Sequence, residues 1–150
     1  MLQFAFDGHA DNPYLPNNFV PNSVVYTGTH DNAPTREWYE ELPADQRNNL
    51  WSYLKRAPPG ESADAAPALM GLSWSSVAAL AIAPLQDLLN LGKGTRMNVP
   101  GRPDGNWSWR STEGMLSPEA FQRLRDLTES SERSAVTGIP PISKMIEAGS

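Results

Sequence analysis

Short apolar runs separated by polar, proline-rich loops set the pattern of this chain. Residues 2–6 are apolar and residues 24–27 are β-branched and aromatic, so each run predicts a buried strand. The first run ends at the turn signal Asp7-Gly8, and the second leads into a polar loop at residues 28–32. Residues 77–82 predict either a strand or the continuation of a preceding helix, because periodicity does not decide the state of a short apolar run.

Helical patterns lie between these runs. Residues 43–56 place Leu50, Tyr53 and Leu54 at the i, i+3, i+4 spacing of one helix face. Residues 65–75 predict a second helix.

Proline and serine positions mark where other helices begin. Pro34 predicts a helix that follows the polar loop at once, and a further helix is expected over residues 85–91. Ser117 is a typical N-cap for a last helix that reaches about Thr128. Residues 132–150 are dominated by Ser, Gly and Pro, and they predict a disordered tail.

The order of these elements indicates an α/β protein. Strand, polar loop, helices, strand and helix alternate in the manner of βα units. Two or three parallel strands make a poor sheet on their own, because a parallel sheet needs both of its faces covered. The pattern therefore suggests that part of the sheet is missing.

Composition narrows the class of partner. The chain has 150 residues, enough for one domain, and its 14 Pro and 11 Gly suit a loop-rich piece. The net charge of −5, without a basic cluster, argues against a nucleic-acid partner. The absence of cysteine agrees with a cytoplasmic protein. The longest apolar segment is too short to span a membrane, and the N-terminus does not resemble a signal peptide.

The polar loop after the second predicted strand carries the strongest candidate chemistry. It places His30, Asp31 and Asn32 just past the C-terminal end of a strand, where catalytic residues lie in a barrel of alternating strands and helices. A second interpretation stays open at this point, in which Asp31 or Asn32 caps the following helix. Two His and no Cys are too few for a transition-metal site, so no metal and no cofactor is expected.

Four stretches in the chain carry a resemblance to a known family, in the family's own order. They are Phe4-Ala5-Phe6-Asp7-Gly8 with Asn12-Pro13-Tyr14-Leu15-Pro16, Thr27-Gly28-Thr29-His30-Asp31-Asn32, Ala83-Pro84-Leu85-Gln86-Asp87, and Arg96-Met97-Asn98-Val99-Pro100-Gly101-Arg102-Pro103 with Gly105-Asn106-Trp107-Ser108-Trp109-Arg110. The sequence resembles the amylomaltases, the 4-α-glucanotransferases of glycoside hydrolase family 77. The last stretch is the most specific.

The resemblance implies a fold and an activity. Residues 1–131 would form the C-terminal segment of a (β/α)8 TIM barrel, incomplete here and with loop-rich insertions. The implied activity transfers segments of α-1,4-glucans (maltooligosaccharides, starch or glycogen) to a glucose or glucan acceptor with retention of configuration. The family uses an Asp nucleophile, a Glu acid/base and a second Asp that stabilises the transition state. That second Asp maps onto Asp31, and the others lie on earlier strands, so we expect the fragment to be inactive alone.

The resemblance also implies substrate contacts. His30 would donate to a hydroxyl of the sugar at Asp31, and a loop lining the glucan groove would supply further contacts. Packing anchors are an equally open interpretation of the two Trp in that loop. The implied substrate-binding residues are His30, Asn106, Trp107, Trp109, Phe4 and Asp7. Asp87 is expected to cap or bridge near the end of the barrel.

The chain departs from the family pattern at Asn17, where the family has His, and at Ala33-Pro34, where it has Asp-Thr. Because the second change begins two residues after Asp31 in the sequence, we expect it to disturb how the carboxylate is held. Two other functions stay open: a non-catalytic carbohydrate-binding piece that keeps the groove, and a complementing fragment that docks on a chain carrying the earlier strands.

Overall fold

The computed structural model describes residues 1–58 and 61–133 of the chain. Its 3-10 turns are Leu2–Phe4, Pro16–Asn18, Ser62–Asp64 and Glu113–Met115. In chain order the strands and helices are β1 (Val24–Tyr26), α1 (Thr35–Glu41), α2 (Ala44–Tyr53), α3 (Ala65–Trp74), β2 (Leu80–Ile82), α4 (Leu85–Leu88) and α5 (Pro118–Ser130). The expected α/β class is confirmed.

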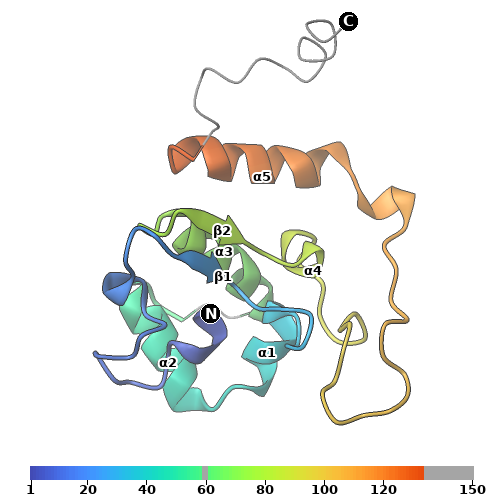
Figure 1. Ribbon diagram of the computed structural model, residues 1–150, viewed down its shortest axis with the longest axis horizontal. Coiled ribbons are helices and arrows are strands. Elements are labelled where there is room, and N and C mark those ends of the chain that lie inside the picture. The colour runs from blue at the N-terminus through green and yellow to red at the C-terminus, as the bar shows by residue number, and fades with distance from the viewer. Residues whose placement is uncertain (59–60, 134–150) are drawn as a thin grey trace, which may run out of the picture.

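β1 and β2 form a parallel pair in the described part of the chain, with Val24 opposite Leu80 and Tyr26 opposite Ile82. A parallel pair requires a long crossover, and α1, α2 and α3 supply it (Figure 1). In the ambiguous run at residues 77–82, residues 77–79 are irregular and residues 80–82 form the strand. Because the two strands are parallel, their C-terminal ends open onto the same edge.

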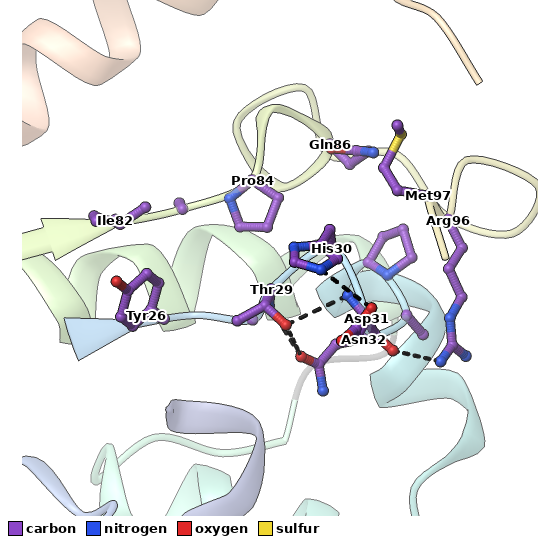
Figure 2. A pocket seen from close by; sticks show the side chains of 14 residues that line it. Tyr26, Thr29, His30, Asp31, Asn32, Ile82, Pro84, Gln86, Arg96 and Met97 are labelled. Atoms are coloured by element: carbon purple, nitrogen blue, oxygen red, sulfur yellow. Dashed lines mark hydrogen bonds and ion pairs between the residues drawn. The ribbon is translucent and has the colours of Figure 1, made fainter. Parts of the chain in front are cut away.

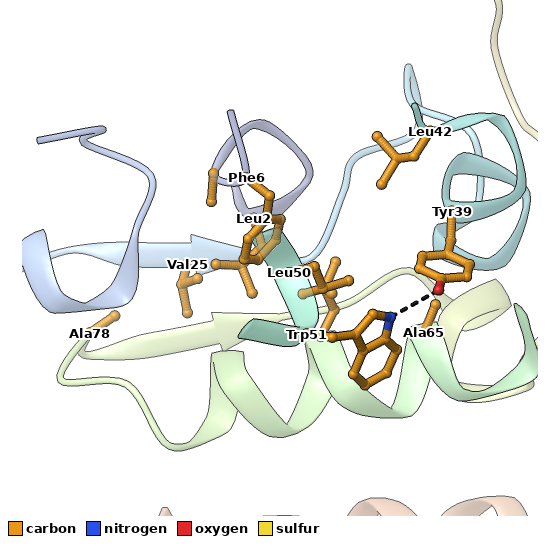
Figure 3. Packing of buried hydrophobic residues seen from close by; sticks show 11 residues of the cluster. Leu2, Phe6, Val25, Tyr39, Leu42, Leu50, Trp51, Ala65 and Ala78 are labelled. Carbon is orange, nitrogen blue, oxygen red and sulfur yellow. Dashed lines mark hydrogen bonds between the residues drawn. The ribbon is translucent and has the colours of Figure 1, made fainter. Parts of the chain in front are cut away.

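One face of this sheet packs against the hydrophobic core (Figure 3). Val25 of β1 is buried with Leu2 and Leu50 in the same cluster. Trp51 fills the α2 side of that cluster and donates its indole N–H to the Tyr39 hydroxyl at 2.8 Å. The buried ring nitrogen is thereby satisfied, as apolar surroundings require.

The opposite face of the sheet is exposed. Side chains alternate along a strand, so Val24, Leu80 and Ile82 point away from Val25. Their exposed fractions are 47%, 52% and 37%. Parallel sheets are normally covered on both faces, and this apolar face needs a covering partner to be stable in water.

The strand predicted over residues 2–6 is wrong. Leu2–Phe4 forms a 3-10 turn, and Gln3 donates its backbone N–H to the Thr27 carbonyl at 3.3 Å. The Phe4 carbonyl accepts from the Asn12 side chain at 2.8 Å instead of from a neighbouring strand. The apolar run is buried as expected, but burial of five residues does not dictate an extended backbone.

The predicted helices are confirmed with changed ends. α4 stops at Leu88 rather than at residue 91, because Asn90 takes the left-handed conformation (φ 53°) that ends a helix. The predicted N-cap of α5 is present, since Ser117 Oγ accepts from the Ala120 N–H at 3.3 Å. From residue 134 onward, the tail predicted over residues 132–150 lies outside the described residues. In the part of the chain that is described, no helix has both the length and the apolar content of a membrane span.

Candidate functional site

The loop between β1 and α1 forms the tip of the site. Asn32 closes it, because its Oδ1 accepts hydrogen bonds from the Thr29 N–H at 3.0 Å and from Thr29 Oγ1 at 2.7 Å. The Asp31 N–H also lies 3.4 Å from Thr29 Oγ1. These short-range contacts bend the backbone so that His30 and Asp31 sit together at the turn.

Asp31 points into a cleft and does not cap a helix. Its Oδ1 accepts from Asn98 Nδ2 at 2.6 Å and lies 3.2 Å from His30 Nε2. The side chain is 46% exposed, which leaves its other oxygen open to a ligand. Pro34 occupies the N-cap of α1, and Asn32 is used by Thr29, so the capping interpretation of both residues is wrong.

His30 and Asp31 line a cavity of about 620 Å³ at the C-terminal ends of both strands (Figure 2). A volume of this order suits a small-molecule site. The lining residues come from the end of β1 and the loop after it, from the end of β2 through the start of α4, and from the loop after α4: Tyr26, Gly28, Thr29, His30, Asp31, Asn32, Ala33, Pro34, Ile82, Ala83, Pro84, Gln86, Arg96 and Met97.

Asp87 fixes both ends of the loop. Its side chain is buried, and Oδ2 accepts from Thr27 Oγ1 at 2.5 Å and from Thr35 Oγ1 at 2.7 Å. Oδ1 accepts the Thr35 N–H at 2.8 Å, which satisfies one of the free donors at the start of α1. The expectation that Asp87 caps and bridges is confirmed by these contacts.

The N-terminal 3-10 turn, Leu2–Phe4, contacts the loop between β1 and α1 through the Gln3 side chain. A Cβ on Gly28 would lie 2.8 Å from Gln3 Nε2, so a larger residue there would displace the end of the Gln3 side chain. The same Gln3 nitrogen donates to the Ala33 carbonyl at 3.0 Å. Pro34 starts α1 with an extended backbone (ψ 146°), and its carbonyl accepts from Trp38 at 2.9 Å. Ala33 and Pro34 are thus accommodated, with Asp31 still hydrogen-bonded.

Trp107 is brought to the site from the loop after α4. Its ring centroid lies 5.1 Å from that of His30, and its side chain is 51% exposed. Its φ of 60° is unusual for a bulky residue and costs about 1–2 kcal/mol. Strain of this kind is a pointer to function, because the surrounding structure must hold it.

Two of the other predicted contact residues, Trp109 and Asn106, lie in the same loop as Trp107. Trp109 lines a second, shallower cavity of about 360 Å³ beside Trp107. Asn106 accepts from the Val99 N–H at 2.9 Å and donates to the Arg102 carbonyl at 2.8 Å, so both ends of its amide shape the loop.

Phe4 and Asp7 do not line the Asp31 cavity. Phe4 packs edge-on against Tyr14, with 5.6 Å between centroids. Asp7 accepts the His9 backbone N–H at 3.0 Å, and this bond, the largest of several causes, holds the pKa of Asp7 below its usual range. A substrate contact at either residue stays a prediction.

Two contacts of the site had no local signal in the sequence. Asn98 lies within a motif stretch, but it stands 67 residues from the carboxylate that it contacts. Arg96 is likewise 65 residues from Asp31. Among residues 1–58 and 61–133, no group of three or more His, Cys, Asp or Glu side chains is placed to hold a metal ion.

Comparison with known proteins gives this geometry a family. A family model described as 4-alpha-glucanotransferase, glycoside hydrolase 77, matches residues 1–116. The chain belongs to the 4-alpha-glucanotransferase family. A 4-alpha-glucanotransferase of Thermus thermophilus is 48% identical over 139 residues, which cover 89% of this chain and 27% of that protein. The chloroplastic/amyloplastic enzyme of Solanum tuberosum is 44% identical over 131 residues, or 85% of this chain and 22% of that protein.

A solved structure supports the same assignment. The amylomaltase of Streptococcus agalactiae in complex with acarbose matches with a TM-score of 0.77 at 28% identity, covering 89% of this chain and 26% of that one. This 4-alpha-glucanotransferase family member therefore spans about a quarter of the length of the relatives that it matches. The resemblance inferred from the four motif stretches is confirmed. Because the potato relative is plastidic by name, a cytoplasmic location stays a prediction.

Proposed function

We propose that this chain is the C-terminal segment of the catalytic barrel of a 4-alpha-glucanotransferase, with Asp31 as the carboxylate that stabilises the transition state. One observation carries the proposal: Asp31 and His30 stand together at the carboxyl ends of two parallel strands and face a 620 Å³ cavity. That edge is the catalytic edge of a (β/α)8 barrel.

The uncovered sheet supports the barrel part of the proposal. Val24, Leu80 and Ile82 are apolar and exposed on the face opposite the helices, where the interior of a barrel would be. The matched share of the relatives, 22–27%, leaves ample length for the remaining strands. Residues 1–131 are the proposed extent of this barrel segment.

The chemistry follows from how Asp31 is held. One oxygen is engaged by Asn98 and His30, and the half-exposed carboxylate can accept from sugar hydroxyls with the other. Hydrogen bonds of this kind strengthen as a pyranose ring distorts toward an oxocarbenium ion, so they lower the barrier rather than only bind substrate. The nucleophile and the acid/base would come from strands outside this sequence.

The proposed substrates are α-1,4-glucans. Trp107 beside His30 offers an exposed aromatic face at the rim, and pyranose rings pack well on such faces. The acarbose in the Streptococcus agalactiae amylomaltase supports a sugar-like ligand at this family's site. His30, Trp107 and Trp109 are the contacts that this geometry favours, with Asn106 shaping their loop.

The test joins this chain to the part of the Thermus thermophilus enzyme outside the matched region. We expect the chimera to release glucose from maltotriose and to form longer maltooligosaccharides. Asp31→Asn should lower kcat about 100-fold or more and change KM little, because the charge is lost while the shape is kept. Asp104→Asn, an exposed carboxylate on the rim loop, is the matched control. Near-normal transfer by the Asp31→Asn chimera would refute the assigned role.

A complementing fragment is the second candidate. The apolar sheet face favours it, because a separate chain carrying the remaining strands would cover that face as well as a covalently joined one. Activity on mixing the two separate chains would identify this case.

A further inference from the structure

The loop after α4 donates hydrogen bonds to two atoms of Asp31. Asn98 Nδ2 donates to the Asp31 carboxylate at 2.6 Å. The guanidinium Nη2 of Arg96 donates to the Asp31 backbone carbonyl, also at 2.6 Å (Figure 2). The side chain and the main chain of Asp31 are thus both held by one short segment, residues 96–98.

The Arg96 and Asn98 hydrogen bonds to Asp31 are linked to each other. Arg96 Nε donates to the Asn98 backbone carbonyl at 2.9 Å, so one guanidinium bridges Asp31 and Asn98. In return, the Asn98 N–H donates to the His30 carbonyl at 3.0 Å. Three hydrogen bonds thus join residues 30–31 to residues 96–98, and a fourth links Arg96 to Asn98 within the second segment. We call this set of four the 30–98 clamp.

This arrangement depends on the shape of the arginine side chain. A guanidinium presents several N–H donors in one rigid plane and can bond two carbonyls at once. Arg96 uses Nε and Nη2 on backbone oxygens and neither on the Asp31 carboxylate. Arg96 therefore holds the backbones of Asp31 and Asn98 in place and does not itself bond the carboxylate.

We propose that Arg96 is a positioning residue that sets the orientation of the Asp31 carboxylate through Asn98, a role that rests on the proposed function of Asp31. Without the clamp, the half-exposed Asp31 carboxylate would be restrained mainly by its 3.2 Å contact with His30 Nε2. Catalytic groups that lose their alignment by about 1 Å can lose about 100-fold in rate. The clamp removes that freedom before a substrate arrives.

The kinetic test uses the chimera. Arg96→Met should lower kcat about 10- to 100-fold and leave KM within about 3-fold. Arg96→Lys keeps the charge but places its donors at one point, so we expect it to lose nearly as much. Arg102→Met removes an exposed arginine from the same loop and should change neither constant. Full recovery of kcat by lysine would overturn the proposal, because charge rather than geometry would then suffice.

A double substitution tests the route through Asn98. If Arg96 acts by holding Asn98, then Arg96→Met combined with Asn98→Ala should lower kcat no further than Asn98→Ala alone. Multiplicative losses in the double variant would show that the two residues act independently, and this would also overturn the proposal.

Hydrogen exchange separates the clamp from the activity. In the Arg96→Met chimera, the Asn98 amide and the amides of residues 28–33 should exchange faster, with the Arg102→Met chimera unchanged. A wild-type chimera with no transfer activity would refute the proposed function, while its exchange pattern would still decide the clamp. Unchanged exchange in Arg96→Met would refute the clamp even in an active chimera.

Discussion

Glu37 is a carboxylate on α1 whose charge interacts with Arg96 of the clamp. Among the described residues, its Oε2 is one of three buried side-chain atoms without a hydrogen-bond partner. Burial, and after it the like charge of Glu41, raises the pKa of Glu37 above its ordinary value, and the nearby Arg96 offsets only part of this. Folding therefore shifts the protonation equilibrium of Glu37 toward the protonated form relative to the unfolded chain.

Glu37→Gln should stabilise the protein at neutral pH but not in acid. Because the pKa of Glu37 is raised on folding, the folded state binds more protons than the unfolded state, and stability is lost as pH rises through the folded pKa. Glutamine removes that loss. Thermal midpoints of the chimera from about pH 4 to about pH 8 should differ from wild type only toward the upper end. Glu129→Gln, an exposed carboxylate on α5, is the control, and an equal gain at both ends of the range would contradict the assignment.

At the scale of elements, Asp87 joins the end of β1, the start of α1 and the beginning of α4. Its buried carboxylate accepts three hydrogen bonds, two of them from Thr35 and one from Thr27. The seven residues between these two threonines carry His30 and Asp31. The position of the candidate catalytic loop is thus set by a third element that contributes neither of those residues.

Asp87→Asn should destabilise this junction by about 2 kcal/mol, because an amide nitrogen cannot accept the hydrogen bonds that the carboxylate oxygen accepts. Chemical denaturation of the chimera should show a lower midpoint, and kcat should fall with it because the loop loosens. Asp11→Asn changes an exposed carboxylate and should leave both unchanged. A stable Asp87→Asn protein with normal kcat would mean that the junction is not needed to hold the loop.

At the scale of the whole molecule, the sheet has one covered and one open face. Val25 lies in the core, while Val24, Leu80 and Ile82 are exposed on the other side. An apolar surface of this kind drives association in water. The 150-residue chain by itself should therefore self-associate. On the proposed function it should also show no transfer activity on maltotriose, because the nucleophile and the acid/base would come from other strands.

Leu80→Lys should affect the isolated chain and the chimera in opposite ways. In the isolated chain the lysine should reduce self-association, measured by light scattering, because it places a charge on the open face. In the chimera the same lysine would be buried in the barrel, and the thermal midpoint should fall sharply. Val20→Lys changes an apolar residue that is 61% exposed but lies outside the sheet, and should do neither. A monomeric wild-type chain with a sharp, reversible transition would contradict the open-barrel interpretation.

Local patterns in the sequence determined β1, α2, α3 and α5. Helix periodicity, a β-branched run and the Ser117 cap are all encoded within a few residues, so each could be recognised without knowing its neighbours. The motif stretches determined the family in the same way. The β-branched run at residues 24–27 placed His30 and Asp31 at the end of a strand.

Only the tertiary structure decided what those residues contact. The turn at Leu2–Phe4 depends on Thr27 and Asn12, and the orientation of Asp31 depends on Asn98, 67 residues away. Asp87 accepts the Thr35 N–H at the start of α1, although the two residues are 52 positions apart in the sequence. Pairs so far apart leave no periodicity in the sequence, because a hydrogen bond across the fold is set by where the backbones meet and not by spacing along the chain.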